Sequence, residues 1–193
     1  MQLIRQFASI AATSLALLAP VAGQAGAIAE AAAAVEAAIA ANDFAAWQAA
    51  NTLMLETLWV APGLHFSKLM LVRVPATGFG SYEQRADNVY AVGESVLIYA
   101  EPAGYGYGDL GGGKFEIAFD LDLTITDPAG AVLAEIPNII ALVYPANGKP
   151  REFLANITYD LNGVTPGEYT LNTTFRDRHS GQSSSFTSDI VVQ

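Results

Sequence analysis

Hydrophobic and polar residues alternate along most of the chain after residue 67, in the pattern of half-buried β-strands. The clearest case is Phe115–Thr126, whose odd positions are apolar and whose even positions are mostly polar or acidic. Because successive side chains of a strand point to opposite faces, this segment predicts one face in a core and one in water. The pattern predicts seven or eight strands, drawn from residues 68–74, 95–100, 115–126, 132–135, 139–144, 153–161, 169–175 and 184–192.

A helical pattern precedes the strands. Residues 28–50 contain 13 alanines and neither Gly nor Pro, and alanine loses no side-chain entropy in a helix. Asn42-Asp43 predicts the N-cap of a second helix, which Pro62-Gly63 ends. We expect a hairpin or a bent helix that packs on the strands. The alternative is a partner-binding helix whose Phe and Trp side chains occupy a groove of another protein.

The first residues have the pattern of a secretory signal peptide. One basic residue stands in Met1–Arg5, Phe7–Leu18 is apolar or small, and Ala25-Gly26-Ala27 offers a cleavage site. The apolar stretch is shorter than the roughly 20 residues of a spanning helix, so we expect no transmembrane anchor. The sequence therefore predicts a periplasmic or secreted protein that is cleaved near Ala27.

These patterns predict a mainly β fold, an antiparallel immunoglobulin-like β-sandwich preceded by an α-helical segment. The expected organisation is a signal peptide at 1–27, an Ala-rich helical segment at 28–62 and the β-sandwich at 63–193. Tyr169 begins a strand just after the turn at Pro166-Gly167. This is the position of a tyrosine corner, whose hydroxyl bonds to upstream backbone.

Two motifs in this region carry a resemblance to a group of exported bacterial proteins of unassigned activity. They are Pro166-Gly167-Glu168-Tyr169 and Asp177-Arg178-His179-Ser180-Gly181, and they accompany three earlier segments at 78–82, 88–94 and 99–102. The resemblance implies Ala-rich helices before an exported sandwich. It implies no catalytic residue.

Composition narrows the function classes. The chain has no Cys, which excludes a disulfide scaffold and a thiolate metal site. Its formal net charge is −10, and this balance argues against binding a nucleic-acid backbone. Hydrophobic residues make up 52% of the chain, too many for a disordered protein.

The most distinctive local motif is Gly104-Tyr105-Gly106-Tyr107-Gly108-Asp109. Gly106, Gly108 and Gly111 match a dinucleotide fingerprint, but a strand rather than a helix follows, which excludes that interpretation. We expect a mobile loop that presents Tyr105, Tyr107 and Asp109 to a ligand, or else a flexible linker. On the first interpretation, replacing both tyrosines by Ala weakens binding without changing the melting temperature.

Glu116, Asp120 and Asp122 share the outward face of one predicted strand. Carboxylates are ligands for Ca²⁺, but a flat strand face spreads them apart and no calcium-loop motif is present. We therefore expect a solvated acidic face, no metal site and no cofactor, with calcium as the alternative.

Catalytic motifs are absent from the sequence, and His65 and His179 are its only histidines. We therefore predict a non-enzymatic binding module that contacts an envelope protein or a glycan through the Gly/Tyr loop. Two alternatives stay open. One is a periplasmic hydrolase in which a histidine meets a carboxylate, and the other is a structural component of an envelope assembly.

Overall fold

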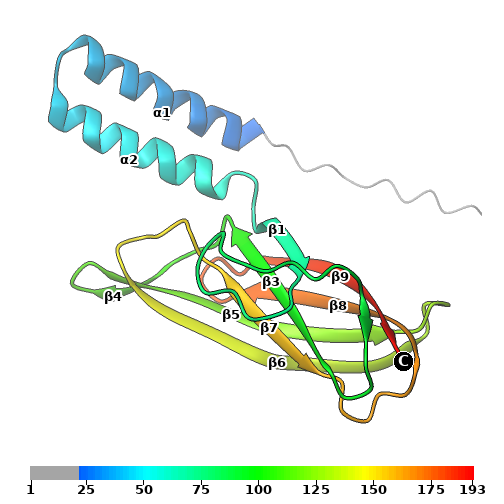
Figure 1. The fold of residues 1–193 in the computed structure, drawn as a ribbon. Helices are drawn as coiled ribbons and strands as arrows, with labels where there is room; N and C mark the ends of the chain where they lie inside the picture. The colour runs from blue at the N-terminus through cyan, green and yellow to red at the C-terminus, as the bar shows by residue number, and fades with distance from the viewer. Residues whose placement is uncertain (1–21) are drawn as a thin grey trace, which may run out of the picture.

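The computed structural model describes residues 22–193 (Figure 1). Residues 1–21 of the predicted signal peptide lie outside the described part. Two helices, α1 (Ala22–Ala40) and α2 (Phe44–Val60), precede nine strands. The strands are β1 (His65–Leu71), β2 (Val89–Tyr90), β3 (Ser95–Ala103), β4 (Gly108–Gly111), β5 (Lys114–Thr126), β6 (Val132–Asn147), β7 (Ala155–Asp160), β8 (Gly167–Asp177) and β9 (Ser183–Val192).

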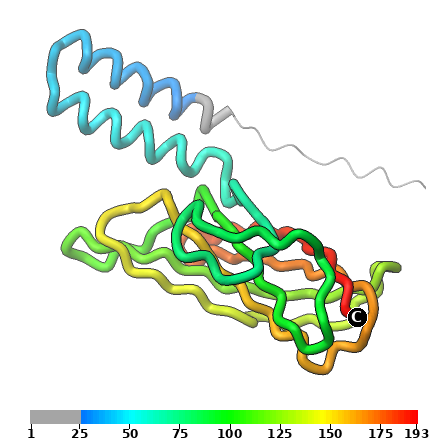
Figure 2. The backbone as a smooth tube through the Cα atoms, in the orientation of Figure 1, coloured from blue at the N-terminus to red at the C-terminus, as the bar shows by residue number. Residues whose placement is uncertain are grey.

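The two helices form a hairpin. Asp43 is the N-cap of α2, and its Oδ1 accepts a hydrogen bond from the backbone N–H of Ala46 at 3.0 Å, as predicted. Ala31 and Ala38 of α1 are buried, whereas no residue of α2 is. The hairpin lies outside the two sheets, and α2 leads directly into β1 (Figure 2). Neither helix in the described region has the length and apolar character needed to cross a bilayer.

Two sheets make up the rest of the chain, which we call the β-domain. The smaller sheet has the order β1-β3-β7, and the larger has the order β2-β9-β8-β5-β4, with β6 along the other edge of β5. All pairings are antiparallel except β2 with β9. The fold is therefore mainly β, with nine strands in the described part rather than the seven or eight predicted.

One core lies between the sheets. Val96 and Ile157 contribute to it from the smaller sheet, and Phe119 and Phe175 from the larger. The alternation predicted for Phe115–Thr126 holds on the core side of β5, where Ile117, Phe119, Leu121 and Leu123 are buried.

The β6 strand differs from the prediction. The sequence pattern predicts two strands, at 132–135 and 139–144. The chain instead continues as one strand alongside β5, with a register irregularity opposite Leu121 and Leu123. Between these two positions β6 has two residues more than β5, and Asn138 accommodates them with φ +53°, a left-handed conformation that Asn tolerates better than most residues.

Tyr169 makes the predicted corner contact. Its hydroxyl donates to the carbonyl oxygen of Thr165, four residues upstream, at 2.8 Å. This hydrogen bond fixes the turn that leads into β8.

Candidate functional site

Alternate glycines let the segment Gly104–Gly108 pass close to neighbouring chain segments. A Cβ on Gly104 would lie 2.1 Å from the carbonyl oxygen of Gly63, and one on Gly106 would lie 2.8 Å from the backbone nitrogen of Ser180. A Cβ on Gly108 would lie 2.3 Å from the His179 ring. The spacing of these glycines therefore reflects close packing and does not reflect phosphate binding.

Asp177 anchors the same segment from the end of β8. Its side chain is buried and accepts hydrogen bonds from the Gly106 N–H at 2.6 Å, the His179 N–H at 2.9 Å and the Ser180 hydroxyl at 2.5 Å. Buried carboxylates require such partners. The Asp-x-x-Ser-Gly motif thus holds its own turn and the Gly/Tyr segment together.

Tyr105 is therefore not presented by a mobile loop. Its side chain is 0% exposed and packs edge-on against Phe119 and Phe153 of the core. Burial raises the pKa of its hydroxyl. Tyr105 belongs to the core, so we expect its truncation to lower the stability of the protein, contrary to the expectation from the sequence.

Tyr107 is half-buried and shares a hydrogen-bond acceptor with Tyr105. Both hydroxyls donate to the carbonyl oxygen of Pro150, each at 2.7 Å. Burial raises the pKa of Tyr107 as well. The two tyrosines thus fix the backbone between Lys149 and Arg151, the two cationic residues that flank Pro150.

Trp59 connects helix α2 to the segment that carries Tyr105 and Tyr107. Its indole N–H donates to the carbonyl oxygen of Tyr105 at 2.9 Å, and its ring meets the Tyr105 ring edge-on at 5.0 Å between centroids. The Arg151 guanidinium lies 5.6 Å from the Trp59 ring centroid. One turn earlier on α2, Glu56 pairs with Lys149 at 2.8 Å.

These contacts surround a groove of about 520 Å³ between α2 and the β-domain. We call it the junction groove, and it is lined by Thr52, Leu55, Glu56, Thr57, Trp59, Val60, Tyr105, Gly106, Tyr107, Lys149 and Arg151. Its volume lies within the range of small-molecule sites, roughly 300–1,000 Å³. Within the described residues, Glu56 neutralises Lys149, whereas Arg151 forms no ion pair. The groove therefore offers aromatic surface and one free guanidinium.

Asp109 does not belong to this groove. It is exposed on β4, and its Oδ1 accepts a hydrogen bond from the Gly111 N–H at 2.7 Å, which closes the turn before β5. Of the three residues predicted to bind a ligand together, the structure brings Tyr105 and Tyr107 to one place and leaves Asp109 elsewhere.

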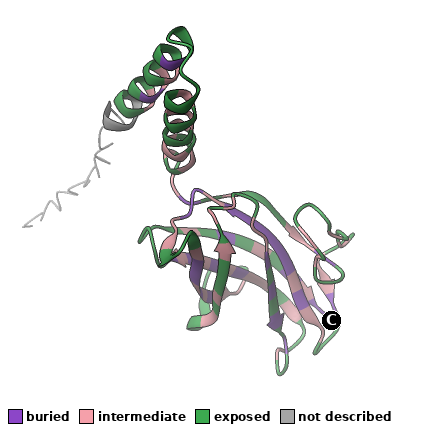
Figure 3. Ribbon diagram, turned by 90° about the vertical axis from the view of Figure 1, so that its left-hand side faces the viewer, coloured by how far each residue is buried: buried purple, intermediate pink, exposed green. Residues whose placement is uncertain are grey.

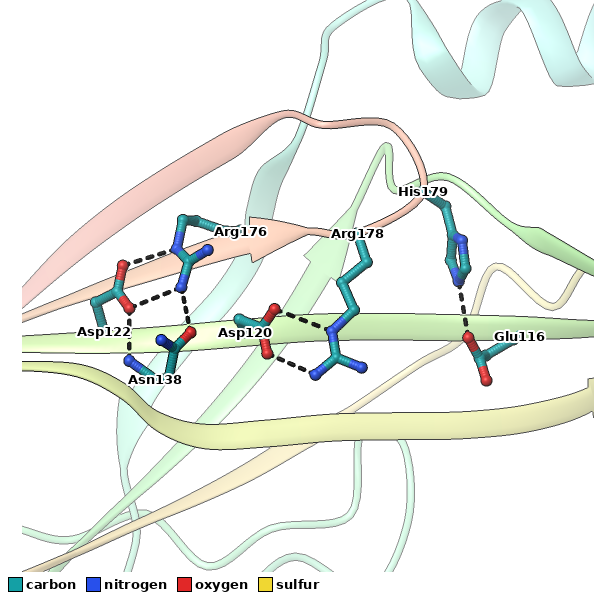
Figure 4. Close-up of polar contacts among 7 residues, drawn as sticks. All are labelled: Glu116, Asp120, Asp122, Asn138, Arg176, Arg178 and His179. Carbon is teal, nitrogen blue, oxygen red and sulfur yellow. Dashed lines mark hydrogen bonds and ion pairs between the residues drawn. The ribbon is translucent and has the colours of Figure 1, made fainter.

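On the predicted acidic face, two arginines and a histidine each contact one of the three carboxylates (Figure 4). Asp122 pairs with Arg176 at 2.8 Å, Asp120 with Arg178 at 2.6 Å and Glu116 with His179 at 3.1 Å. Hydrogen bonds from the arginines lower the pKa of both aspartates. Each carboxylate faces its own partner, and no cluster of metal-ligating side chains occurs within residues 22–193. The calcium alternative for Glu116, Asp120 and Asp122 therefore has no geometric support.

The two histidines lie apart from each other. His65 Nδ1 is 2.8 Å from the carbonyl oxygen of Gly63. His179 Nε2 is 3.1 Å from Glu116, but the Ser180 hydroxyl beside it donates to Asp177. Neither histidine lines the junction groove.

Lys149 and Arg151 were not identified as site residues from the sequence, although the distribution of charge along the chain points to them. Residues 28–147 contain 4 basic and 14 acidic residues, whereas 148–193 contain 4 and 5. The first two basic residues of this less acidic region are Lys149 and Arg151, which flank a single proline.

Comparison with known proteins does not assign the chain to a protein family. No protein-family model and no curated protein matches the chain. Among solved structures, it is similar to the sporulation control protein Spo0M from Bacillus subtilis, with 15% identity and a TM-score of 0.35 over 67% of this chain. It is also similar to the Pseudomonas fluorescens alkylpurine DNA glycosylase AlkC, with 10% identity and a TM-score of 0.35 over 77% of this chain. The matches cover 49% and 38% of those two chains.

Proposed function

We propose that this protein is an exported binding module of the bacterial envelope and that the junction groove is its ligand site. The signal-peptide pattern of residues 1–27 supports export to the periplasm or beyond. The Tyr169 corner supports an immunoglobulin-like arrangement of the two sheets. The observation that carries the proposal is the groove itself, where Trp59, Tyr107 and Arg151 converge.

The ligand class that fits this lining best is an acidic glycan. Arg151 is a fixed positive charge that can bind a carboxylate through two parallel hydrogen bonds. Trp59 and Tyr107 supply flat, amphipathic surface of the kind that contacts a ring with both apolar and polar edges. Because the protein is acidic overall, a negative ligand is attracted only to a cation that no acidic side chain neutralises, and within the described residues Arg151 is such a cation in the groove.

Calorimetric titration with an oligogalacturonate tests this proposal. We expect saturable binding, and we expect Arg151→Gln to weaken it by roughly 10-fold or more, since a charge-assisted hydrogen bond contributes about 1.5–3 kcal/mol. Arg73→Gln is the matched control, because Arg73 is exposed, pairs with Glu83 and lies outside the groove. The same glycan with its carboxyl groups reduced to alcohols should bind as weakly as the native glycan binds to the Arg151 variant.

Equal binding of the reduced and acidic glycans would contradict the proposed role of Arg151. Binding of an oligoglutamate peptide with the same dependence on Arg151, in the absence of glycan binding, would replace the glycan by an acidic protein segment.

A hydrolase is the second candidate, and the His179–Glu116 contact of 3.1 Å is the observation that favours it. A histidine beside a carboxylate is the usual pair in general acid–base catalysis. Hydrolysis of chromogenic ester and glycoside substrates, lost in both His179→Ala and Glu116→Gln, would support this function. Turnover that both variants retain would exclude it.

A further inference from the structure

The helical hairpin carries an apolar surface that the β-domain does not cover. Four side chains form what we call the hairpin face, namely Ile39, Phe44, Trp47 and Leu58. Phe44 is 72% exposed, Ile39 62% and Leu58 41%. Figure 3 shows the hairpin standing away from the β-domain with most of its surface exposed.

These four side chains lie on one side of the hairpin. Phe44, Trp47 and Leu58 are spaced by three and eleven residues, which places them along one stripe of α2. The Phe44 and Trp47 rings stack at 5.5 Å between centroids. Ile39 of α1 joins them in lining a hollow of about 350 Å³ at the tip of the hairpin, together with Asp43.

The charge around this face has a single sign. Residues 6–67 contain no Lys or Arg, whereas the hairpin carries Glu30, Glu36, Asp43 and Glu56. Of these four acids, only Glu56 forms an ion pair within the described residues, and that pair belongs to the junction groove. The hairpin face is therefore an apolar stripe in an acidic setting.

We infer that the hairpin face binds an amphipathic helix of a partner protein, with Lys or Arg residues flanking the apolar stripe of that helix. Such helices dock through apolar side chains at intervals of three, four and seven residues, and the spacings of three and eleven residues on α2 follow the same helical repeat. Flanking cations complement Asp43, which lines the hollow with Ile39 and Phe44, and Glu36, which lies three residues before Ile39 on the same side of α1. A second copy of this chain would bring the same acids against them, and an anionic bilayer would repel them. This surface is separate from the junction groove and adds a protein partner to the proposed function.

Two designed helical peptides test the inference, one with Leu and Lys in an amphipathic pattern and one with Glu in place of every Lys. Each is added to the purified, ¹⁵N-labelled protein, and the indole N–H signals of Trp47 and Trp59 are followed separately. We expect the Lys peptide to shift the Trp47 signal and leave that of Trp59 in place. The Glu peptide should bind at least ~10-fold more weakly, since like charges then meet across the interface.

Two variants distinguish binding of the Lys peptide at the hairpin face from its non-specific attraction to an acidic protein. Phe44→Ser combined with Leu58→Ser should weaken binding of the Lys peptide by roughly 10-fold or more. The control Leu53→Ser should change binding by less than about 2-fold, because Leu53 is on the opposite side of α2 and is 57% exposed. Melting temperatures should stay the same, since all three side chains are exposed.

Three results would overturn the inference. The first is binding of the Lys peptide that is unchanged in the Phe44/Leu58 variant. The second is self-association of the protein that this variant abolishes, which would make a second copy the occupant. The third is binding to neutral phosphatidylcholine vesicles that this variant abolishes, which would make a lipid surface the occupant. The proposed function of the junction groove is tested separately, with a glycan and the Trp59 signal. A failure of that proposal can therefore be distinguished from a failure of this inference.

Discussion

The Tyr107 hydroxyl donates a hydrogen bond to the carbonyl oxygen of Pro150 at 2.7 Å. Tyr107 comes from the segment before β4, and Pro150 from the connection between β6 and β7. Because Lys149 and Arg151 flank this carbonyl, the hydrogen bond sets the position from which their side chains reach the junction groove. The junction groove therefore depends on a fixed backbone as well as on the side chains that line it.

Tyr107→Phe should loosen this connection without removing the ring. We expect the free energy of unfolding to fall by about 1 kcal/mol, the usual contribution of one hydrogen bond, and glycan binding to weaken several-fold. Urea denaturation and calorimetric titration measure the two effects. Tyr144→Phe is the control, because the Tyr144 hydroxyl makes no hydrogen bond within the described residues and its side chain is 51% exposed. Equal effects of the two substitutions would contradict the positioning role of Tyr107.

Tyr105→Ala should behave as a core substitution. Removing a fully buried aromatic ring lowers the free energy of unfolding by about 3–5 kcal/mol. Tyr105→Phe keeps the ring and should lose only about 1 kcal/mol, for the hydrogen bond to Pro150. Thermal and urea denaturation distinguish the two, and a Tyr105→Ala protein as stable as wild type would show that the ring is not buried.

Gly104→Ala should be far more damaging than Gly113→Ala. The two glycines have φ of +76° and +77°, so the conformational penalty for a side chain is the same at both. Only Gly104 has backbone within reach, since its new Cβ would lie 2.1 Å from the carbonyl oxygen of Gly63. We expect an additional loss of about 1–3 kcal/mol at Gly104, measured by urea denaturation. Equal decreases in the free energy of unfolding would mean that the backbone around Gly63 moves at no cost to accommodate the new Cβ.

Stability should decrease in acid because of the ion pairs that Asp120 and Asp122 form with arginines. The arginines lower the folded-state pKa of Asp120 and Asp122 below the unfolded value of roughly 3.9. A lowered pKa means that the contribution is complete above the unfolded pKa and is lost as pH falls through the folded-state pKa. Urea midpoints measured from pH 6 down to pH 2 should therefore fall more steeply for wild type than for an Arg176→Met/Arg178→Met variant. Parallel curves would show that these pairs do not couple to folding.

Sequence patterns predicted the elements that depend on local residues and not on contacts with distant parts of the chain. The alternation in β5 needs only a core on one side, and the Asp43 cap needs only the helix that follows it. The division of β6 into two strands was wrong, because Pro137 on an edge strand need not end pairing when Asn138 absorbs the irregularity.

The candidate site was predicted in part. Tyr105 and Tyr107 were singled out, but a glycine-rich segment looks mobile unless its contacts with Gly63, Ser180 and His179 are known. Those contacts join residues far apart in the sequence, as does the placement of Arg151 over Trp59. For the same reason calcium stayed an alternative for the carboxylates of β5, since Arg176 and Arg178, the partners of Asp122 and Asp120, come from another strand and its turn.

Adding oligogalacturonate to the ¹⁵N-labelled protein while the two tryptophan indole N–H signals are followed tests most directly whether the junction groove is the ligand site. Trp59 lines the junction groove, whereas Trp47 lies near the far end of α2 and serves as an internal control. We predict a saturable shift of the Trp59 signal, an unmoved Trp47 signal and loss of the shift in Arg151→Gln. An unmoved Trp59 signal at saturating glycan, or an equal shift of both signals, would contradict the junction groove as the ligand site.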